Sequence, residues 1–422
     1  MSKEYLKRIS DAKLGLLLQA KGAVLIEGPK WCGKTSSAEE VANSVLYMQD
    51  PDTSKANILM AKAKPSLLLD GETPRLLDEW QVAPELWNAV RFAVDKRRTK
   101  GQFILTGSVI PTRTDDMHTG TGRIARMKMR PMSLFETGDS TGEVSLEVLF
   151  NDGVDTEGTS KLSIEKLAFV LNRGGWPAVA QEKNEKVALA VANDYLEAVA
   201  NEDISNVDGI EKSPDRVKAL IRSLSRNISS EAKTSTILQD LKENDEALSQ
   251  VTIDQYVSAL KRLFVIEDLP AWSAKLRSKT AIRTTAKRHF TDPSIAAASL
   301  RATPKRLLSD FETFGFLFES LCIRDLRIYT ESIDGSVYHY RDKSGLEVDA
   351  IIQLADGRWG AVEIKMGAGE IEDASENLLK FKRAIDVKKM NEPSFLMVLT
   401  GTEYAFQMEN GVHVVPLGCL KN

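Results

Sequence analysis

The chain has 422 residues, more than one ordinary domain needs, so we expect two to four domains. Hydrophobic residues make up 42% of the sequence and charged residues 27%, which is typical of a globular protein that dissolves in water. The formal net charge of −4 excludes a globally basic protein, so any surface for nucleic acid or membrane must be local.

The three cysteines, Cys32, Cys322 and Cys419, have no paired spacing, which argues against a disulfide framework or a zinc site. The N-terminal residues carry no apolar core of a signal peptide. No apolar run approaches the roughly 20 residues that span a bilayer. These features predict a cytoplasmic protein without a membrane partner.

A phosphate-binding loop is predicted at residues 28–35. The preceding residues, 21–27, are apolar and β-branched, as in a short buried strand, and a helix rich in Ala and Glu follows. The loop itself has the pattern G-x-x-x-x-G-K-[ST] in this strand–loop–helix context, which disfavours a chance match in a turn. We predict ATP as the ligand, held by Gly28, Pro29, Lys30, Trp31, Cys32, Gly33, Lys34 and Thr35.

Each part of this loop has an expected role. The glycines let backbone N–H groups turn toward phosphates, and the start of the following helix adds partial positive charge. Lys34 is expected to reach the β- and γ-phosphates, and the Thr35 hydroxyl to join the shell of a Mg²⁺ ion.

A second strand is predicted to end in the adjacent carboxylates Asp78 and Glu79. We expect Asp78 to hold Mg²⁺, directly or through water, and Glu79 to act as the general base on the attacking water. Acids are common in turns after strands, so the pair is a weak signal alone. Its place about 45 residues after a phosphate loop strengthens the prediction.

A third strand is predicted at residues 102–108, ending in hydroxyl groups beside a glycine. In a parallel sheet this end faces the ligand, so Thr106 or Ser108 is expected to contact the γ-phosphate, unless these residues only terminate the strand. An amphipathic helix is predicted between these two strands. The alternation indicates a doubly wound α/β fold with a parallel sheet.

Residues 122–131 contain four basic residues and no acid. Arg123 could serve as an arginine finger toward the nucleotide of a neighbouring subunit, which would require a homo-oligomer. A solvated strand edge explains the same residues equally well. Both interpretations stay open.

Three phrases in this order, LLLDGETPRLLDEWQ, FILTGS and GRIARMKMRPMSLFE, resemble the bacterial and archaeal AAA-type ATPases that carry a C-terminal DUF4143 domain. The resemblance covers nearly the whole chain. It implies an ATPase of the AAA+ superfamily joined to a helical lid and to DNA-associated modules. The division predicted on this basis is an AAA+ P-loop core at 1–140, a linker and helical lid at 141–212, a winged helix-turn-helix at 213–303 and a DUF4143-type, PD-(D/E)xK nuclease-like α/β domain at 304–422.

Three short helices are predicted after Pro214, the last one capped by residues 249–252 and followed by a strand at 264–270. This pattern is typical of a winged helix-turn-helix. The next stretch, 271–291, has no acid and predicts contact with DNA phosphates. Its notable residues are Trp272, Lys275, Arg277, Lys279, Arg283, Lys287, Arg288 and His289. A protein interface or a solvated face is the alternative.

The C-terminal residues predict helix–β–β–β–helix–β, the core order of the PD-(D/E)xK nucleases. Glu363 and Lys365 share one strand face, and Asp349 on the preceding strand can meet Glu363 across the ladder. Two carboxylates here could hold Mg²⁺ or Mn²⁺, and Lys365 would help to orient and deprotonate a water. Glu319 resembles the additional acid of such nucleases. A surface ion pair is the alternative for Glu363 and Lys365.

The sequence therefore predicts an ATP-hydrolysing AAA+ protein that acts on DNA, with ATP gating a DNA-binding and Mg²⁺-dependent nuclease module. The competing hypothesis is a nucleotide-dependent switch. In that case the C-terminal domains bind a protein partner and the nuclease fold is inert.

Overall fold

The computed structural model of the protein describes residues 5–110, 119–151, 156–207, 212–242, 248–273, 285–385 and 391–422. The chain divides into two compact units, each with its own main sheet. Unit one comprises residues 1–131, 203–211 and 258–265, and unit two comprises residues 132–202, 212–257 and 266–422.

Unit one is built on a sheet of five parallel strands in the order β2-β3-β4-β1-β5. The strands are β1 (Ala23–Glu27), β2 (Ser44–Tyr47), β3 (Arg75–Asp78), β4 (Phe103–Gly107) and β5 (Ile124–Lys128). This confirms the parallel α/β sheet that the alternation of strands and helices predicted. Because β4 lies between β1 and β3, the strand that precedes the phosphate loop and the strand that ends in carboxylates both border β4.

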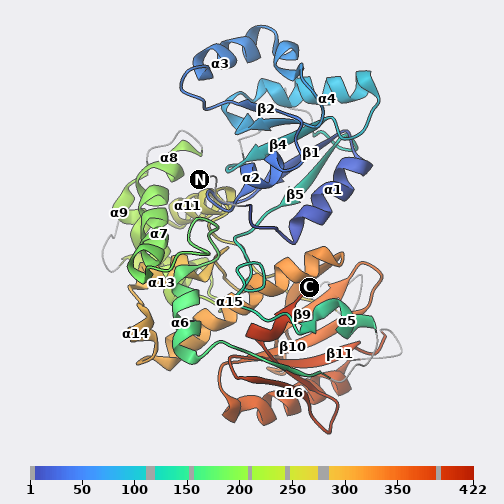
Figure 1. The fold of residues 1–422 in the computed structure, drawn as a ribbon. Helices are drawn as coiled ribbons and strands as arrows, with labels where there is room; N and C mark the ends of the chain where they lie inside the picture. The colour runs from blue at the N-terminus through green and yellow to red at the C-terminus, as the bar shows by residue number, and fades with distance from the viewer. Residues whose placement is uncertain are drawn as a thin grey trace. The chain divides into compact units, whose positions relative to one another are not determined.

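Helices cover both faces of this sheet (Figure 1). They are α1 (Ser10–Ala20), α2 (Lys34–Glu39), α3 (Ser54–Ala63) and α4 (Glu85–Arg97), with 3₁₀ turns at Pro65–Leu69 and Trp80–Val82. Ala23 and Leu25 of β1 pack into the cluster that contains α4, whereas Val24 and Ile26 pack into the one that contains α1 and α2. A strand buried on both faces explains why β1 is apolar throughout.

The helices of the middle region belong mostly to unit two. They are α6 (Ile164–Arg173), α7 (Glu185–Ala198), α9 (Pro214–Arg226), α10 (Thr234–Lys242), α11 (Gln250–Arg262), α13 (Pro293–Leu300) and α14 (Pro304–Leu307). Residues 258–262 of α11 count with unit one, as does the short α8 (Ile204–Asn206), which follows a π-helical turn at Val199–Asp203. The alanine-rich α13 packs against α6, α7 and α9.

The three predicted helices after Pro214 are present as α9, α10 and α11. In place of a regular strand after α11, two antiparallel bridges pair Ile266 with Phe290 and Leu269 with Lys287. The winged helix-turn-helix stays a prediction.

Unit two contains a seven-stranded sheet in the order β7-β12-β13-β11-β10-β9-β8. Its strands are β7 (Gly158–Thr159), β8 (Gly335–Arg341), β9 (Glu347–Leu354), β10 (Trp359–Lys365), β11 (Phe395–Thr400), β12 (Tyr404–Gln407) and β13 (His413–Pro416). The helices α15 (Phe311–Ser332) and α16 (Ile371–Ala384) complete the predicted order of helix, three strands, helix and strand. Nearby, β6 (Val144–Ser145) pairs with β14 (Leu420–Lys421), and α5 (Leu146–Asn151) follows β6.

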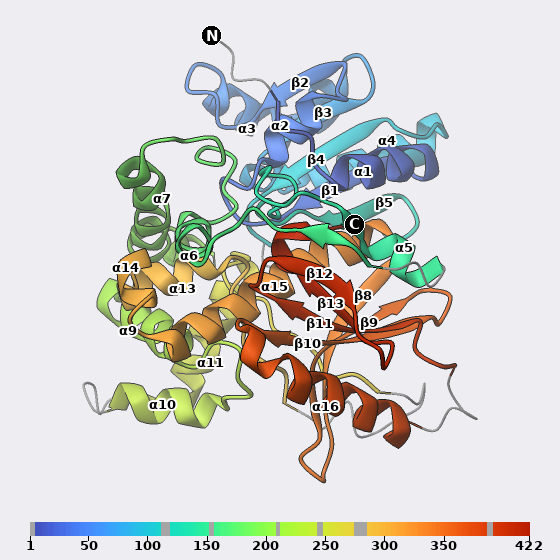
Figure 2. The ribbon, with the colours of Figure 1, turned by 60° about the horizontal axis from the view of Figure 1, so that its bottom comes forward.

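The helix α16 runs along this sheet (Figure 2). Its residues Leu378 and Phe381 pack with Trp359 and Ala361 of β10. Trp272 joins the same core, with its ring centroid 5.1 Å from that of Trp359. Trp272 is therefore a core residue of unit two, and in this position it cannot stack on a nucleic-acid base as part of the predicted basic strip.

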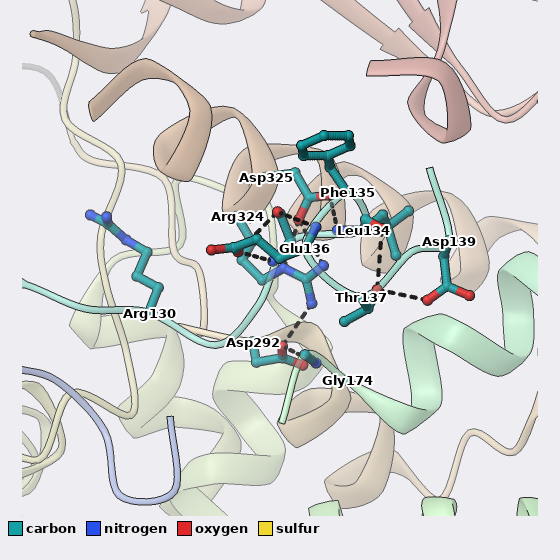
Figure 3. A network of polar contacts seen from close by, with 12 residues as sticks. Arg130, Leu134, Phe135, Glu136, Thr137, Asp139, Gly174, Asp292, Arg324 and Asp325 are labelled. Atoms are coloured by element: carbon teal, nitrogen blue, oxygen red, sulfur yellow. Dashed lines mark hydrogen bonds and ion pairs between the residues drawn. The ribbon is translucent and has the colours of Figure 1, made fainter. Parts of the chain in front are cut away.

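A buried network fixes the segment 132–139, which we call the docking segment, onto α15 within unit two (Figure 3). Arg324 is almost fully buried and lies between Asp292 at 2.8 Å and Asp325 at 2.7 Å. The second carboxylate oxygen of Asp325 accepts a hydrogen bond from the Leu134 backbone N–H at 2.9 Å. Asp292 also caps the start of α13 through the Ser294 N–H. The RPMSLFE phrase of the sequence, residues 130–136, thus contains the first part of the docking segment.

No helix among the residues that the structure describes is long and apolar enough to span a bilayer.

Candidate functional site

The phosphate loop follows β1 and depends on its glycines. A Cβ atom at Gly28 would overlap the carbonyl oxygen of Met129, so only glycine fits there. Gly33 has φ of +97°, in the left-handed region that favours glycine, and starts α2. Trp31 also has a positive φ, of +64°, and its side chain is 48% exposed. The loop therefore has the strained, glycine-dependent backbone of a phosphate cradle.

Lys34 lies across this loop. Its side chain is buried, and its ammonium group donates hydrogen bonds to the carbonyl oxygens of Gly28 at 3.0 Å and Pro29 at 2.8 Å. These partners are neutral, so the charge of Lys34 is not cancelled by a carboxylate among the described residues. An ammonium group held in this way is available to an anionic ligand.

Thr35 of the loop, Asp78 of β3 and Thr106 of β4, which the sequence predicted separately, come together. The Oδ1 atom of Asp78 accepts hydrogen bonds from the Thr35 hydroxyl at 2.7 Å and from the Thr106 hydroxyl at 2.6 Å. The strand order brings these groups together, because β4 borders both β1 and β3. A hydroxyl and a carboxylate oxygen are ligands that Mg²⁺ prefers, so this donor set fits the predicted ion.

Glu79 follows directly after β3 with φ of +53°. Its N–H donates to the Thr106 hydroxyl at 3.2 Å, and its Oε2 accepts a hydrogen bond from Ser108 at 3.1 Å and another from Gln81. The sequence did not single out Gln81 as a site residue, although it belongs to the DEWQ phrase. Hydrogen bonds on both the main chain and the side chain thus orient the Glu79 carboxylate.

The remaining loop residues have other contacts. Cys32 is buried, with its sulfur 3.6 Å from the Met129 carbonyl oxygen. Lys30 forms an ion pair with Asp203 at 2.5 Å, and Asp203 belongs to unit one although it follows α7 in the chain. Nothing in the local sequence around Asp203 pointed to this contact, which depends on the tertiary structure.

Arg123 lies just before β5, at the amino end of the sheet, whereas the phosphate loop follows the carboxyl end of the parallel strand β1. Its guanidinium group pairs with Asp95 of α4 at 2.8 Å. The structure therefore does not bring Arg123 to the phosphate loop of its own chain. A role toward a neighbouring subunit stays a prediction.

In unit two, the structure brings Asp349, Glu363 and Lys365 together at β9 and β10. The Lys365 ammonium lies 3.2 Å from Glu363 Oε2 and 3.7 Å from Asp349 Oδ2. Asp349 also accepts a hydrogen bond from the Ile364 N–H at 2.9 Å, and Glu363 accepts one from Asn377 of α16 at 2.8 Å. Asn377 was not predicted from the sequence.

Glu319 of α15 joins this group through Lys287, which was predicted from the sequence to belong to the phosphate-contacting strip at 271–291. The Lys287 ammonium lies 3.0 Å from Glu319 Oε1 and 3.4 Å from Asp349 Oδ1. We call the five residues Lys287, Glu319, Asp349, Glu363 and Lys365 the carboxylate–lysine cluster.

Burial shifts the pKa values in this cluster. It raises the pKa of Glu319 to about 7 and, together with the negative charge of Asp349, that of Glu363 to about 8. Burial also acts to raise the pKa of Asp349, but Lys287 and Lys365 outweigh it and the pKa is lowered. For both lysines the nearby carboxylates outweigh burial and raise the pKa. Near neutral pH, Asp349 and the two lysines therefore carry charge.

The predicted phosphate-contacting strip at 271–291 requires a correction for its described basic residues. Lys287 is buried in the cluster, and Arg288 donates to both carboxylate oxygens of Asp268 at 2.9 and 3.1 Å. A buried ammonium group needs acidic partners to offset its lost hydration, which explains why Lys287 turns inward. The other basic residues of the strip, Lys275, Arg277, Lys279 and Arg283, lie outside the described residues.

The divalent ion predicted at Asp349 and Glu363 does not fit this arrangement. In the ranges that the structure describes, no three His, Cys, Asp or Glu side chains gather as a group that could hold a metal. Two ammonium groups lie 3.0 to 3.7 Å from the carboxylates instead. The charge that a metal would balance is already balanced by lysine.

The cluster borders a pocket of about 480 Å³. Glu319 and Lys365 line it, together with aromatic and aliphatic side chains that include Phe311, Phe316, Ile364 and Met366. Two members of the cluster therefore face a space that a ligand could enter.

Three family models match consecutive segments of the chain. An AAA domain matches residues 20–138, a domain of unknown function, DUF8612, matches residues 164–306, and a second, DUF4143, matches residues 314–420. The middle domain was not predicted under this description.

Similar proteins include uncharacterised proteins of Mycobacterium tuberculosis and Mycobacterium bovis. Each is 21% identical over 85% of this chain and 74% of its own length. A solved Walker-type ATPase of Pyrococcus abyssi is 13% identical over 71% of this chain and 97% of its own, with a TM-score of 0.42. AMPPCP-bound DnaA from Aquifex aeolicus is 15% identical over 60% of this chain and 86% of its own, with a TM-score of 0.23.

Proposed function

Because the chain belongs to the AAA-type ATPases that carry a C-terminal DUF4143 domain, we propose that unit one binds and hydrolyses ATP. The observation that carries this proposal is the meeting of Thr35, Asp78 and Thr106 within 2.7 Å hydrogen bonds beside the phosphate loop. A Mg²⁺ ion bound with ATP would offset negative charge on the phosphates.

The residues of the chain divide the chemical work. Lys34 would exchange its carbonyl partners for phosphate oxygens, because charge-assisted hydrogen bonds are stronger than those to neutral carbonyls. Glu79, oriented by Ser108 and Gln81, would take a proton from the attacking water as its oxygen bonds to the γ-phosphorus. The bond between that phosphorus and the β–γ bridging oxygen breaks, and ADP and phosphate are formed. Thr106 holds both Asp78 and the Glu79 main chain in place.

Purified full-length protein tests this proposal directly. Glu79→Gln should bind a fluorescent ATP analogue with nearly wild-type affinity while releasing phosphate at least about a hundredfold more slowly, as expected when a general base is removed. Glu85→Gln, an acid at the start of α4, serves as the matched control. Wild-type phosphate release by Glu79→Gln would reject this assignment of the base.

We further propose that the nucleotide state is passed to unit two through the backbone after β5. In unit one, Met129 donates its N–H to Glu27 at 2.7 Å and packs its carbonyl against Gly28 of the phosphate loop. A few residues along the chain, in unit two, Leu134 is held by Asp325 of α15, the helix that also carries Glu319. A change at the phosphate loop would thus pull on a segment anchored to α15.

Hydrogen–deuterium exchange can test this coupling. In Glu79→Gln, which should trap ATP, peptides of α15 and of the docking segment should exchange differently with ATP than with ADP. Identical exchange in both nucleotide states would reject coupling along this route while leaving ATP hydrolysis itself untouched.

The arrangement of unit two favours the switch hypothesis over the nuclease hypothesis, because lysines already neutralise the carboxylates of the cluster.

Contact with DNA remains a second candidate. It is supported by the exposed polar side chains of α11, namely Asp254, Gln255, Ser258 and Lys261. Incubation with plasmid and linear DNA, ATP and Mg²⁺ or Mn²⁺ separates the two. Cleavage of DNA that is lost in Asp349→Ala and Lys365→Ala would favour the nuclease hypothesis. If DNA neither binds to the protein nor stimulates its ATP hydrolysis, the switch hypothesis is favoured.

A further inference from the structure

The carboxylate–lysine cluster holds its own cations. Lys287 and the acids it contacts are largely buried, with side chains 9% exposed for Lys287 and 14% exposed for both Glu319 and Asp349. Lys365 approaches Asp349 and Glu363 through the other oxygen of Asp349. Each carboxylate of the cluster therefore contacts at least one ammonium group.

Lys287 lies between two of the acids that could hold a metal in this cluster. Its nitrogen contacts carboxylate oxygens of both Glu319 and Asp349, which come from different elements, α15 and β9. A divalent ion shared by these oxygens would need distances of about 2.0 to 2.6 Å to them. Such an ion and the ammonium group would repel each other strongly at this separation, so only one of them can occupy the position.

The backbone delivers Lys287 to this position. Its N–H donates to the Leu269 carbonyl at 3.0 Å, and its carbonyl accepts the Leu269 N–H at 2.8 Å. Two residues along, the His289 carbonyl accepts the Glu267 N–H at 2.8 Å, and the Arg288 pair with Asp268 lies between these two bridges. Lys287 is thus fixed by four neighbouring contacts and is not a surface lysine that happened to fold inward.

We propose that the Lys287 ammonium group is the resident cation of this cluster and keeps divalent metal out of it. Unit two then has the strand order and the acids of a metal site, but a lysine fills the place of the ion. This inference concerns unit two alone and stands whether or not unit one hydrolyses ATP. It also predicts that a single substitution restores a metal site.

Manganese binding tests the proposal, with Mn²⁺ followed by electron paramagnetic resonance and calorimetry in nucleotide-free, full-length protein. All variants carry Asp78→Asn, so that the phosphate-loop region does not contribute. The Asp78→Asn protein with Lys287 intact should show no Mn²⁺ site that depends on Asp349. Lys287→Met should bind one Mn²⁺, with an affinity at least about tenfold higher than that of the protein with Lys287 intact, because removing an ammonium group beside the ligands removes a direct repulsion. Adding Asp349→Asn should abolish the new site.

Thermal unfolding gives a second readout. Mn²⁺ should raise the melting temperature of Lys287→Met but not that of the Lys287 wild type or of Lys287→Met/Asp349→Asn, since a ligand stabilises only the state that binds it. Lys382→Met removes an exposed lysine of α16 and is the matched control, expected to gain no site.

Two results would overturn the proposal. One is stoichiometric Mn²⁺ binding by the protein with Lys287 intact that is lost in Asp349→Asn or Glu319→Gln. The other is a folded Lys287→Met that gains no Mn²⁺ site. Should Lys287→Met fail to fold, the titration of the protein with Lys287 intact still decides the question.

Discussion

The nucleotide site of unit one and the carboxylate–lysine cluster of unit two are made of similar side chains that are paired differently. In unit one, the Lys34 ammonium contacts main-chain carbonyls, and Asp78 contacts the hydroxyls of Thr35 and Thr106. In unit two, Lys287 and Lys365 contact the carboxylates directly. Lys34 and Asp78 are thus not paired with each other in unit one, whereas lysines and carboxylates are paired directly in unit two.

This difference shows how the pairing of charges separates a site prepared for a ligand from one that is internally satisfied. A lysine held by neutral carbonyls gains a stronger partner when an anion arrives. A buried lysine already paired with acids gains little from a ligand and loses much if a partner is removed. Substitutions of the polar site residues are therefore expected to lower activity in unit one and to lower stability in unit two.

The largest expected effect is the loss of turnover in Lys34→Ala. Without this ammonium group, charge on the transferred phosphate is less stabilised, and we expect phosphate release to fall by about 10³-fold or more. A coupled assay of phosphate release measures this. Lys62→Ala on the exposed side of α3 should retain full turnover. Wild-type turnover by Lys34→Ala would show that this ammonium group does not act on the phosphates.

Asp349→Asn should destabilise unit two by about 3 kcal/mol, because it leaves the buried Lys287 and the half-buried Lys365 with one charged partner fewer. Asp78→Asn in unit one should cost about 1 kcal/mol or less, because it alters hydrogen bonds to two hydroxyls only. Urea unfolding followed by hydrogen exchange of β9 and β3 peptides separates the two. Equal losses in both variants would remove the distinction drawn here.

The stability of unit two should fall as the pH rises from 6.5 to 8.5. Glu319 and Glu363 have pKa values raised to about 7 and about 8 by burial, so the folded state holds protons that the unfolded state has already released. The contribution of these two acids to the free energy of unfolding is fully present below their unfolded pKa values and is lost as the pH rises through their folded pKa values. Between pH 6.5 and 8.5 the expected loss is about 2 kcal/mol. Glu363→Gln should flatten the dependence in urea titrations, and an unchanged slope would contradict it.

Thr106→Val should slow ATP turnover about tenfold, equivalent to about 1.4 kcal/mol, because Asp78 and the Glu79 main chain lose a shared hydroxyl. Thr106→Ser keeps the hydroxyl and should recover most of the rate. Steady-state kinetics with both variants checks this, and equal rates for Val and Ser would show that the hydroxyl does not matter.

The smallest effect is expected for Lys30→Ala. Lys30 of the phosphate loop pairs with Asp203, whose side chain is only 8% exposed, but the Lys30 side chain is 43% exposed, so water still reaches the pair and screens it in part. We expect a loss of stability of about 0.5 kcal/mol, measured by urea unfolding. A loss as large as that of Asp349→Asn would mean that exposure does not explain the difference between the two sites.

Much of the fold follows from local patterns. The loop at 28–35, the acids after β3 and the hydroxyls after β4 are each defined by a few consecutive residues, and the parallel sheet brings such strand ends to one edge. The order of helix and strands in the C-terminal region follows in the same way from period and turn residues. Glu363 and Lys365 share a face because they are two residues apart on a strand.

Long-range partners could not be predicted from these patterns. Lys287 stands in a run of basic residues, and its sequence neighbours suggest a solvated or phosphate-binding surface. Asp203 and Asn377 carry no local signal that ties them to a site, yet each contacts a predicted residue. Their roles depend on which elements pack together. Gln81 lies only two residues after Glu79 and was missed although it is close in the sequence.

The phosphate loop, the acids after β3 and the hydroxyl groups at the end of β4 could be predicted in this order, because each of these features consists of residues that are consecutive in the chain. Which charged groups contact one another depends on the packing of elements that are distant in the chain. This packing leaves Lys34 on neutral carbonyls and places Lys287 between Glu319 and Asp349. The physical reason is that burying an ammonium group requires compensating charge, and the compensating residues lie far away in the sequence.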